Sequence, residues 1–377
     1  MKIIQVLSCA FLIFATLHCN SKKTVDNQMT IIGDLKNCPD GKIYLVQQNV
    51  QTFNRSNVDS TLLVNGRFLF KISVKDPLSF YSFNVVDKDG NKLLFHFKTN
   101  KTYNSGKYFS ENFMPADSVF VTGKIQIFEP KNKELPNKIK LVYPDTMIVA
   151  GKQTDVMFNV TLPIGREMSD DSFQKITETI SKYNYSYFLL NEVYNYRGNF
   201  SKEQVNTLIN LFDKAVQTHA MVSQLKKSLE LRNGGSLTNV SFINSNGRME
   251  KLNLSQSKLT MVILWASWCG PCRKEIPSLK ELYQAYPVNS GLNMVSISLD
   301  RDSLAWRTAL KEEKMSWNQW LLPENLSEYT REIFKHNGSI PATLFLNSSG
   351  QILEIFSGFD QTTMDKYRSI IQKNIVN

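Results

Sequence analysis

Two cysteines three positions apart, Cys269 and Cys272, stand in the sequence Trp-Cys-Gly-Pro-Cys. They follow an apolar run over residues 261–265 and precede a helical pattern over about 273–286. A thiol at a helix N-terminus lies near unpaired N–H groups and the positive end of the helix dipole, so we expect the pKa of Cys269 to fall. The second thiol lies within one turn and can resolve a mixed disulfide. The spacing predicts reversible dithiol chemistry, with Cys269 exposed and Cys272 more buried.

Other uses of the pair fit less well. A structural zinc site needs four ligands. The other residues that could supply them show no ligand spacing: Cys38, His96, His219 and His336. A peroxiredoxin would need Pro and Thr or Ser where Val262 and Ala266 precede Cys269. No Gly-rich phosphate loop, Gly-x-Ser-x-Gly elbow or paired carboxylates compete elsewhere, so we predict no metal and no cofactor.

The elements around the pair must hold it at a strand-to-helix junction. A later strand is expected over residues 294–299, and a helix from near Ser303. A hairpin of residues 343–347 and 352–356 is expected across Ser348-Ser349-Gly350. Strands alternating with helices predict an α/β domain.

This segment, from about Gly235 to Asn377, resembles the thioredoxin-like domain of the TlpA/ResA-like thiol:disulfide oxidoreductases. Pro277, five residues after Cys272, falls where such proteins kink the active-site helix. Ile340-Pro341-Ala342-Thr343 matches the cis-proline segment that lies against the disulfide, and Glu275 matches the buried acid of ResA-like proteins. The departure is at residues 237–240, where Leu-Thr-Asn-Val replaces the usual Ala-Pro-x-Phe.

The resemblance implies roles for particular residues. The catalytic set would be Cys269, Cys272 and Glu275, with Glu275 exchanging a proton with Cys272. The substrate-binding set would be Trp268, Gly270, Pro271, Ile340 and Pro341. It also implies protein disulfides as substrates, with apocytochrome c cysteines or misoxidised envelope proteins among them. The electron donor would be a membrane thiol carrier of the CcdA/DsbD kind.

Alternatives remain for the direction of the reaction and for the activity itself. Gly-Pro between the cysteines resembles the reducing thioredoxin type more than the Cys-Pro-His-Cys oxidases, so we expect a reductase rather than an oxidase or isomerase. A binding module in the envelope, with the thioredoxin-like domain mainly a scaffold, is the alternative from another class. The joint presence of both cysteines, Pro341 and Glu275 argues against it.

At 377 residues the whole chain is too long for one typical domain. Hydrophobic residues make up 42% of it and charged residues 21%, which excludes wholesale disorder and a polytopic membrane protein. The net charge of +10 comes from scattered basic residues. No helix-turn-helix, zinc-finger or RNA-binding signature accompanies it, so we expect no nucleic-acid partner.

Residues 28–128 show short alternating runs between turn signals, which predicts an antiparallel β domain, a sandwich or partial barrel. Asn65-Gly66 between two such runs indicates a type I′ hairpin. Asp59-Ser60-Thr61, that Asn-Gly turn and Phe68-Leu69-Phe70 resemble an uncharacterised domain that precedes thioredoxin-like domains in envelope proteins.

Residues 129–232 are expected to form a linker and a helical segment. Pro130, Pro136, Pro144 and Pro163 make the first part too irregular for a helix interior. Helical spacing then runs from Asp170 to Leu231, with a capping box from Ser201 to Gln204. The last domain is expected over residues 235–377.

Residues 1–18 combine a basic start, an apolar middle and a polar exit, which is typical of a signal peptide. Cys19 stands at the depth of a lipoprotein cysteine, and we expect it to carry a lipid. The alternative is plain cleavage, because the match to a lipobox is partial; Cys9 lies too near the start. The chain is therefore expected on the periplasmic side of the cell envelope, anchored to a membrane by this lipid. Cys38 is expected to be a buried small hydrophobe or a thiol that pairs between chains.

Overall fold

The computed structural model describes residues 28–50, 54–103, 106–130, 138–165, 168–233, 237–255, 257–287, 289–360 and 362–375. The signal peptide and Cys19 predicted above lie outside these residues. The chain divides into two compact units. The N-terminal unit takes the described residues up to Pro163 together with Phe173–Glu192, and the C-terminal unit takes Ile164–Ser172 and Val193 onward.

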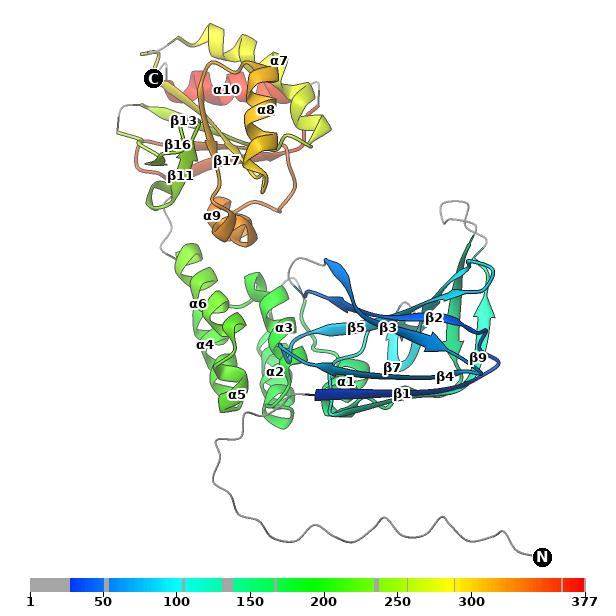
Figure 1. Cartoon of the computed structure of the whole chain (residues 1–377). Coiled ribbons are helices and arrows are strands. Elements are labelled where there is room, and N and C mark those ends of the chain that lie inside the picture. The colour runs from blue at the N-terminus through cyan, green and yellow to red at the C-terminus, as the bar shows by residue number, and fades with distance from the viewer. Residues whose placement is uncertain are drawn as a thin grey trace, which may run out of the picture. The chain divides into compact units, whose positions relative to one another are not determined.

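The N-terminal unit is built from ten strands (Figure 1). They are β1 Gln28–Lys36, β2 Gly41–Gln48, β3 Arg55–Leu63, β4 Arg67–Ser73, β5 Phe80–Asp87, β6 Lys92–Phe95, β7 Phe97–Tyr103, β8 Gly106–Ser110, β9 Ser118–Phe128 and β10 Ile139–Pro144. Strands β7 and β8 form a separate hairpin. The other eight form one sheet in the order β3-β2-β5-β6-β10-β9-β1-β4.

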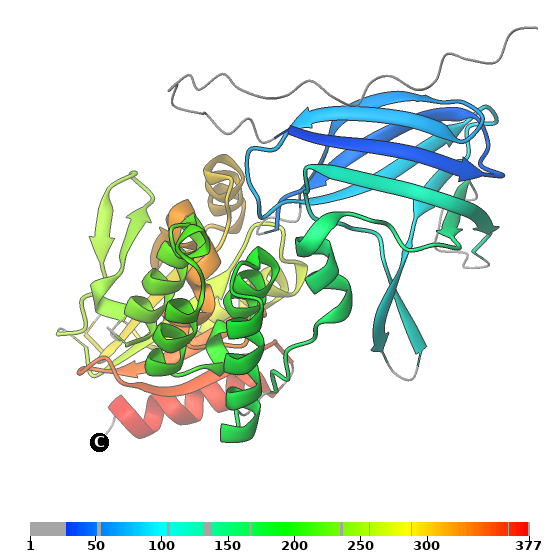
Figure 2. The ribbon, with the colours of Figure 1, turned by 90° about the horizontal axis from the view of Figure 1, so that it is seen from below.

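The sheet curls so that its first and last strands are joined by the predicted hairpin, as both views of the strands show (Figures 1 and 2). Val64 and Arg67 exchange backbone hydrogen bonds of 3.2 and 3.0 Å. Asn65 and Gly66 between them have φ of 50° and 76°, as a type I′ turn requires. The expectation of a β domain is confirmed, but the expectation that it is antiparallel throughout is wrong.

Two strand pairs of this sheet are parallel, β1 with β9 and β6 with β10, while the others are antiparallel. Parallel neighbours need a long crossover connection, and alternation of apolar residues does not reveal which distant strand will be the partner. Strand β10 and helix α1 (Gly151–Asn159) lie within the proline-containing stretch that we expected to be irregular. The prolines flank both elements: Pro144 ends β10, and α1 lies between Pro144 and Pro163.

The predicted helical segment is confirmed as a series of helices. They are α2 Asp170–Lys182, α3 Tyr187–Asn195, the 3-10 helix η1 Arg197–Asn199, α4 Lys202–Leu211, α5 Lys214–Gln217 and α6 Ala220–Asn233. Ser201 and Gln204 form the expected capping box at the start of α4. Most of α2 and α3 belongs to the N-terminal unit, whereas η1 and α4–α6 belong to the C-terminal unit.

The remainder of the C-terminal unit is a seven-stranded sheet with helices, the expected thioredoxin-like α/β fold. Its strands are β11 Ser241–Asn244, β12 Met249–Lys251, β13 Leu259–Trp265, β14 Leu292–Ser298, β15 Asn318–Leu321, β16 Ala342–Asn347 and β17 Ile352–Ser357. Its helices are η2 Leu237–Asn239, α7 Gly270–Ala285, α8 Ser303–Glu313, η3 Glu324–Tyr329, α9 Thr330–Phe334 and α10 Thr363–Ile375. The strand order is β12-β11-β15-β14-β13-β16-β17.

Strand β13 is the centre of this unit, because all seven of its residues are buried and it has a partner on each side. Met261 and Ile263 pack into one core with residues of α7 and α10. Val262 and Leu264 face the opposite core, which includes residues of η3 and α9. The alternation follows from the two-residue period of a strand. The cysteine motif leaves from the carboxyl end of β13, after Trp265. Among the described residues, no helix is both long and apolar enough to cross a membrane.

Candidate active site

The two cysteines form a disulfide at the point where β13 gives way to α7. Their Cα atoms are 5.3 Å apart, within the usual range for a disulfide. Cys269 is the N-cap residue of α7, and its Sγ accepts the backbone N–H of Cys272 at 3.2 Å. Pro271 stands in the first turn, where its missing N–H costs no helical hydrogen bond. The placement predicted from the sequence is therefore confirmed.

The predicted exposure of Cys269 is wrong for this oxidised form. Cys269 is 4% exposed and Cys272 2% exposed. The reason is packing, because both belong to one apolar cluster with Trp265, Ile276 and Trp306. Trp268, beside them, is 71% exposed instead. A substrate would therefore meet Trp268 before it meets the sulfur atoms.

The loop before β16 brings the predicted proline segment to the same end of the sheet. The Ile340–Pro341 peptide bond is cis. Ala342 pairs with Leu264 near the end of β13, and Ile340 packs against the apolar cluster that holds the cysteines. The Pro341 carbonyl accepts the N–H of Gly358 at 2.8 Å. A loop with a cis proline beside a disulfide leaves one backbone edge available to an extended peptide.

Glu275 is buried, as predicted, and lies one turn after Cys272 on α7. It is 1% exposed, and its Oε1 accepts a hydrogen bond from the Tyr367 hydroxyl at 3.1 Å. Burial raises the pKa of Glu275 to about 7, and the hydrogen bond from Tyr367 opposes that rise. A carboxyl group with this pKa can hold or release a proton near neutral pH.

Replacing Glu275 by glutamine should change the pH dependence of stability. The native state holds this proton more tightly than the unfolded chain, whose carboxyl has its ordinary value of 4.5. The protonated Glu275 carboxyl therefore makes its whole contribution to the stability of the folded state below pH 4.5. This contribution is lost as the pH rises through about 7. In urea unfolding, the free energy of unfolding of Glu275→Gln relative to that of the wild type should rise by about 3 kcal/mol from pH 5 to pH 8. Glu281→Gln, exposed on the same helix, is the control, and parallel pH curves for the wild type and Glu275→Gln would contradict the assignment.

Two residues that the sequence did not single out also shape the site. Tyr367 comes from α10, 92 positions from Glu275, and no local pattern marks it. Asp300 is buried just beyond β14, and its carboxylate accepts the Ser267 N–H at 2.8 Å and the Ser267 hydroxyl at 2.7 Å. It thereby fixes the loop that leads into Cys269. One signal in the sequence could have identified Asp300: it lies just beyond the carboxyl end of β14, a parallel strand beside β13.

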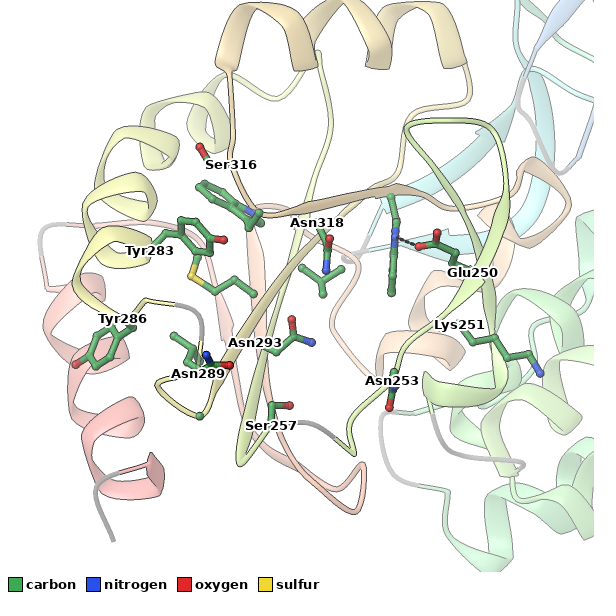
Figure 3. Close-up of a pocket in the computed structure, with 16 residues that line it drawn as sticks. Glu250, Lys251, Asn253, Ser257, Tyr283, Tyr286, Asn289, Asn293, Ser316 and Asn318 are labelled. Carbon is green, nitrogen blue, oxygen red and sulfur yellow. Dashed lines mark hydrogen bonds between the residues drawn. The ribbon is translucent and has the colours of Figure 1, made fainter.

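A polar cavity of about 560 Å³ lies elsewhere in the C-terminal unit (Figure 3). Amide and hydroxyl side chains make up half of its lining, and Trp320 Nε1 donates to Glu250 at 3.1 Å on one wall. Neither cysteine nor Pro341 belongs to its lining. We therefore assign the thiol chemistry to the end of β13 and not to this cavity.

Cys38 is partly buried in the N-terminal unit and forms no disulfide. Burial raises the pKa of its thiol to about 12, and the nearby Asp40 charge adds to the rise. Such a thiol stays protonated and is a poor nucleophile at neutral pH. This agrees with the expectation of a small buried residue.

Comparisons with known proteins point to the same chemistry. Residues 256–352 match the family described as Thioredoxin-like, and residues 29–112 match a domain of unknown function, DUF4369. The chain is 30% identical over 103 residues to the thiol-disulfide oxidoreductase ResA of Oceanobacillus iheyensis. It is 27% identical over 101 residues to the sporulation thiol-disulfide oxidoreductase A of Bacillus subtilis. The matches cover 27% and 26% of this chain, and 51% and 58% of those proteins.

Among solved structures, the thioredoxin domain of a thiol-disulfide oxidoreductase from Bacteroides vulgatus is 26% identical, with a TM-score of 0.32. That match covers 35% of this chain and 92% of the other. The chain spans about half the length of the first curated relative that it matches, the ResA protein. Its C-terminal part is a thioredoxin-like domain related to the ResA-type thiol-disulfide oxidoreductases, and its N-terminal part is a DUF4369 domain.

Proposed function

We propose that this protein is an exported thiol:disulfide oxidoreductase that reduces disulfides in proteins of the cell envelope. The observation that carries the proposal is the Cys269–Cys272 disulfide at the N-terminus of α7, at the same end of the sheet as the cis Ile340–Pro341 bond. The names of the relatives support the reaction class. Gly270 and Pro271 between the cysteines favour reduction over oxidation.

The reduced pair would act in two steps. The Cys269 thiolate attacks one sulfur of a substrate disulfide, so that a mixed disulfide forms and the other substrate sulfur leaves as a thiolate that takes up a proton. Cys272 then gives up its proton and attacks Cys269 Sγ, which releases the second substrate thiol. The substrate gains two electrons and two protons, and the cysteine pair loses them.

The surrounding residues have separate tasks in these steps. Glu275, one turn below Cys272 and with a pKa of about 7, would accept the proton of the second thiol. Trp268, Ile340 and Pro341 would contact the substrate. The backbone of Ile340 would pair with it, because Pro341 has no N–H and its carbonyl accepts from Gly358. In the same reaction, Glu275→Gln should slow resolution of the mixed disulfide and alter its pH dependence.

The cellular setting completes the proposal. Export rests on the signal-peptide pattern of residues 1–18, and attachment to a membrane on a lipid at Cys19. A membrane dithiol carrier of the CcdA/DsbD kind would return two electrons to the oxidised pair. Mass spectrometry of the mature N-terminus tests the lipid: an unmodified residue there would remove that part of the proposal.

Reduction of insulin by the full chain tests the reaction. With dithiothreitol as electron source, the protein should accelerate cleavage of the insulin disulfides, seen as precipitation of the free B chain. A rate equal to that of dithiothreitol alone would overturn the proposed activity. Faster disulfide formation in a reduced test protein, without insulin reduction, would reverse the assigned direction.

A further inference from the structure

A second polar cavity, of about 640 Å³, lies in the C-terminal unit where η1, the end of α6 and α9 meet. Its lining includes neither of the redox cysteines nor Pro341. Four basic side chains from these elements line it: Arg197, Arg232, Arg331 and Lys335. Only two acidic side chains do so, Glu328 and Glu332. The balance of charge in the cavity is therefore positive.

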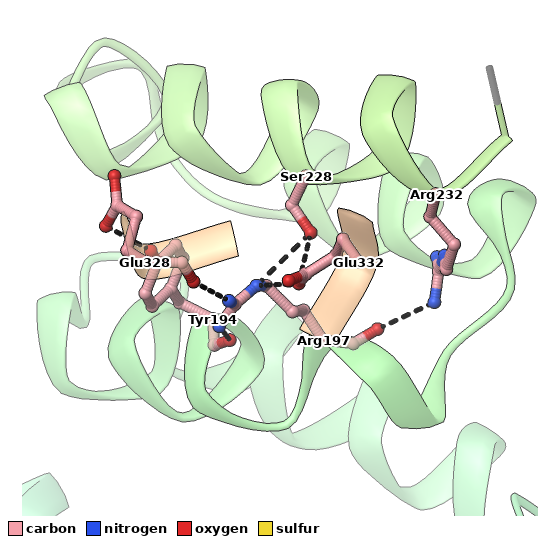
Figure 4. A network of polar contacts seen from close by, with 6 residues as sticks. All are labelled: Tyr194, Arg197, Ser228, Arg232, Glu328 and Glu332. Carbon is pink, nitrogen blue, oxygen red and sulfur yellow. Dashed lines mark hydrogen bonds and ion pairs between the residues drawn. The ribbon is translucent and has the colours of Figure 1, made fainter. Parts of the chain in front are cut away.

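Both acids are already engaged within the protein (Figure 4). Arg197 Nε donates to Glu332 Oε1 at 2.6 Å, and the Ser228 hydroxyl donates to the same oxygen at 2.9 Å. Tyr194 donates its hydroxyl to Glu328 Oε2 at 2.7 Å. Arg197 is thus paired with Glu332, whereas Glu328 is held by a neutral hydroxyl and keeps its charge. The basic side chains of the cavity still outnumber its carboxylates.

No ion pair within the described residues joins Arg232, Arg331 or Lys335 to an acidic side chain, although the charge of Glu203 acts on Arg232. Arg232 Nη1 donates to the Arg197 carbonyl at 3.1 Å, but Arg232 Nη2 is buried and has no acceptor within the described structure. Arg331 and Lys335 are exposed and line the same cavity, Arg331 in α9 and Lys335 as its C-cap residue. Like charges around one cavity repel one another, and a bound anion would relieve that repulsion.

The backbone of η1 leaves room for such an anion. A Cβ added at Gly198 would meet no atom within 4 Å, so the space in front of this residue is open. His336 contributes no charge near neutral pH, because burial and the neighbouring Arg331 lower its pKa. The positive potential of the cavity therefore comes from its arginine and lysine side chains.

We propose that this cavity binds a phosphate-bearing anion. Phosphate has enough oxygens to accept from Arg232 Nη2, Arg331 and Lys335 at once. Its protonated oxygen could also donate to Glu332 Oε2, which is buried without a donor in the described structure. A simple carboxylate has two oxygens and no donor, so it would satisfy fewer of these groups. The phosphate could belong to a small soluble molecule or to a phospholipid headgroup.

Titration of the full chain with inorganic phosphate, at constant ionic strength set with chloride, tests the site by calorimetry. Arg331→Gln with Lys335→Gln should weaken binding by about tenfold or more, because two charge-assisted contacts are lost. The matched control is Arg307→Gln with Lys311→Gln, an exposed Arg–Lys pair at the same spacing on α8. Equal affinity in both double variants, or no phosphate binding by the wild type, would overturn the proposal.

A second variant tests the location without removing a cation. Gly198→Glu places a carboxylate in the open space, and the φ of Gly198 is not in the positive range, so the backbone tolerates a side chain there. It should abolish phosphate binding while the circular dichroism spectrum stays that of the wild type. Unchanged binding by this folded variant would place the phosphate elsewhere and overturn the assignment.

Phosphatidylglycerol vesicles separate the two sources. These tests use the chain with Cys19→Ser, so that no acyl chain contributes to membrane binding. Its sedimentation with vesicles, lost when Arg331→Gln/Lys335→Gln is added and kept with the α8 control, would identify a headgroup. Phosphate binding without sedimentation would identify a soluble phosphorylated molecule. Both results support the site, and each names a different origin for its ligand.

Discussion

Cys269→Ser should lower the rate of insulin reduction by more than about a thousandfold, because it removes the sulfur that attacks the substrate. Cys272→Ser should also stop turnover, yet for a different reason. Its Cys269 can still form the mixed disulfide, but no second thiol lies within one turn to release the product. The first variant should therefore leave substrate free, whereas the second should hold substrate covalently.

The chain supplies a matched control for these two variants. Cys38 is the one other cysteine within the described residues, and it forms no disulfide. Because burial raises the pKa of its thiol to about 12, Cys38→Ser should reduce insulin at the wild-type rate. Non-reducing electrophoresis after incubation with oxidised substrate reads out the adducts. A covalent adduct on Cys269→Ser, or none on Cys272→Ser, would reverse the roles given to the two thiols.

Features set by local chemistry could be predicted from the sequence. Asn65-Gly66 specifies its hairpin because both residues accept positive φ, and Ser201 with Gln204 specifies the start of α4 because both satisfy free N–H groups. Cys269 at the start of α7 follows from the apolar run of β13 and the proline after Gly270. Each of these signals lies within a few positions of the residues that it concerns.

Features set by distant partners could not be predicted in this way. The parallel pairing of β1 with β9 joins strands that are about 90 positions apart, as in Thr30 with Ser118. The buried hydroxyl of Tyr367 meets Glu275 only after α10 packs on the sheet. The burial of Cys269 likewise depends on Trp306 from α8, and the residues of the cysteine motif do not predict that contact.

Arg197→Met should destabilise the C-terminal unit by about 3–5 kcal/mol, because it leaves the buried carboxylate of Glu332 without its cation. The side chains of Arg197 and Glu332 are 14% and 7% exposed. Arg197 also donates to the Glu328 carbonyl at 3.0 Å, so its loss frees a second acceptor. The η1 helix would lose its ion pair with α9, while the Ser228 hydroxyl of α6 could still donate to Glu332.

Tryptophan fluorescence during urea unfolding measures this effect in the full chain. The five tryptophans, Trp265, Trp268, Trp306, Trp317 and Trp320, all belong to the C-terminal unit, so selective excitation reports on that unit alone. Arg273→Met is the control, since Arg273 pairs with Glu312 and Glu313 while 37% exposed. An exposed pair contributes at most about 1 kcal/mol.

The double variant Arg197→Met/Glu332→Met decides whether the loss of stability in Arg197→Met comes from the unpaired charge or from lost packing. Removing both partners leaves no unpaired charge, so its stability should recover most of the loss seen in Arg197→Met. A double variant as unstable as Arg197→Met would mean that the methylene groups of Arg197 matter and its charge does not. If Arg197→Met instead cost no more than Arg273→Met, the ion pair between η1 and α9 would contribute nothing to the stability of the C-terminal unit beyond that of an exposed pair.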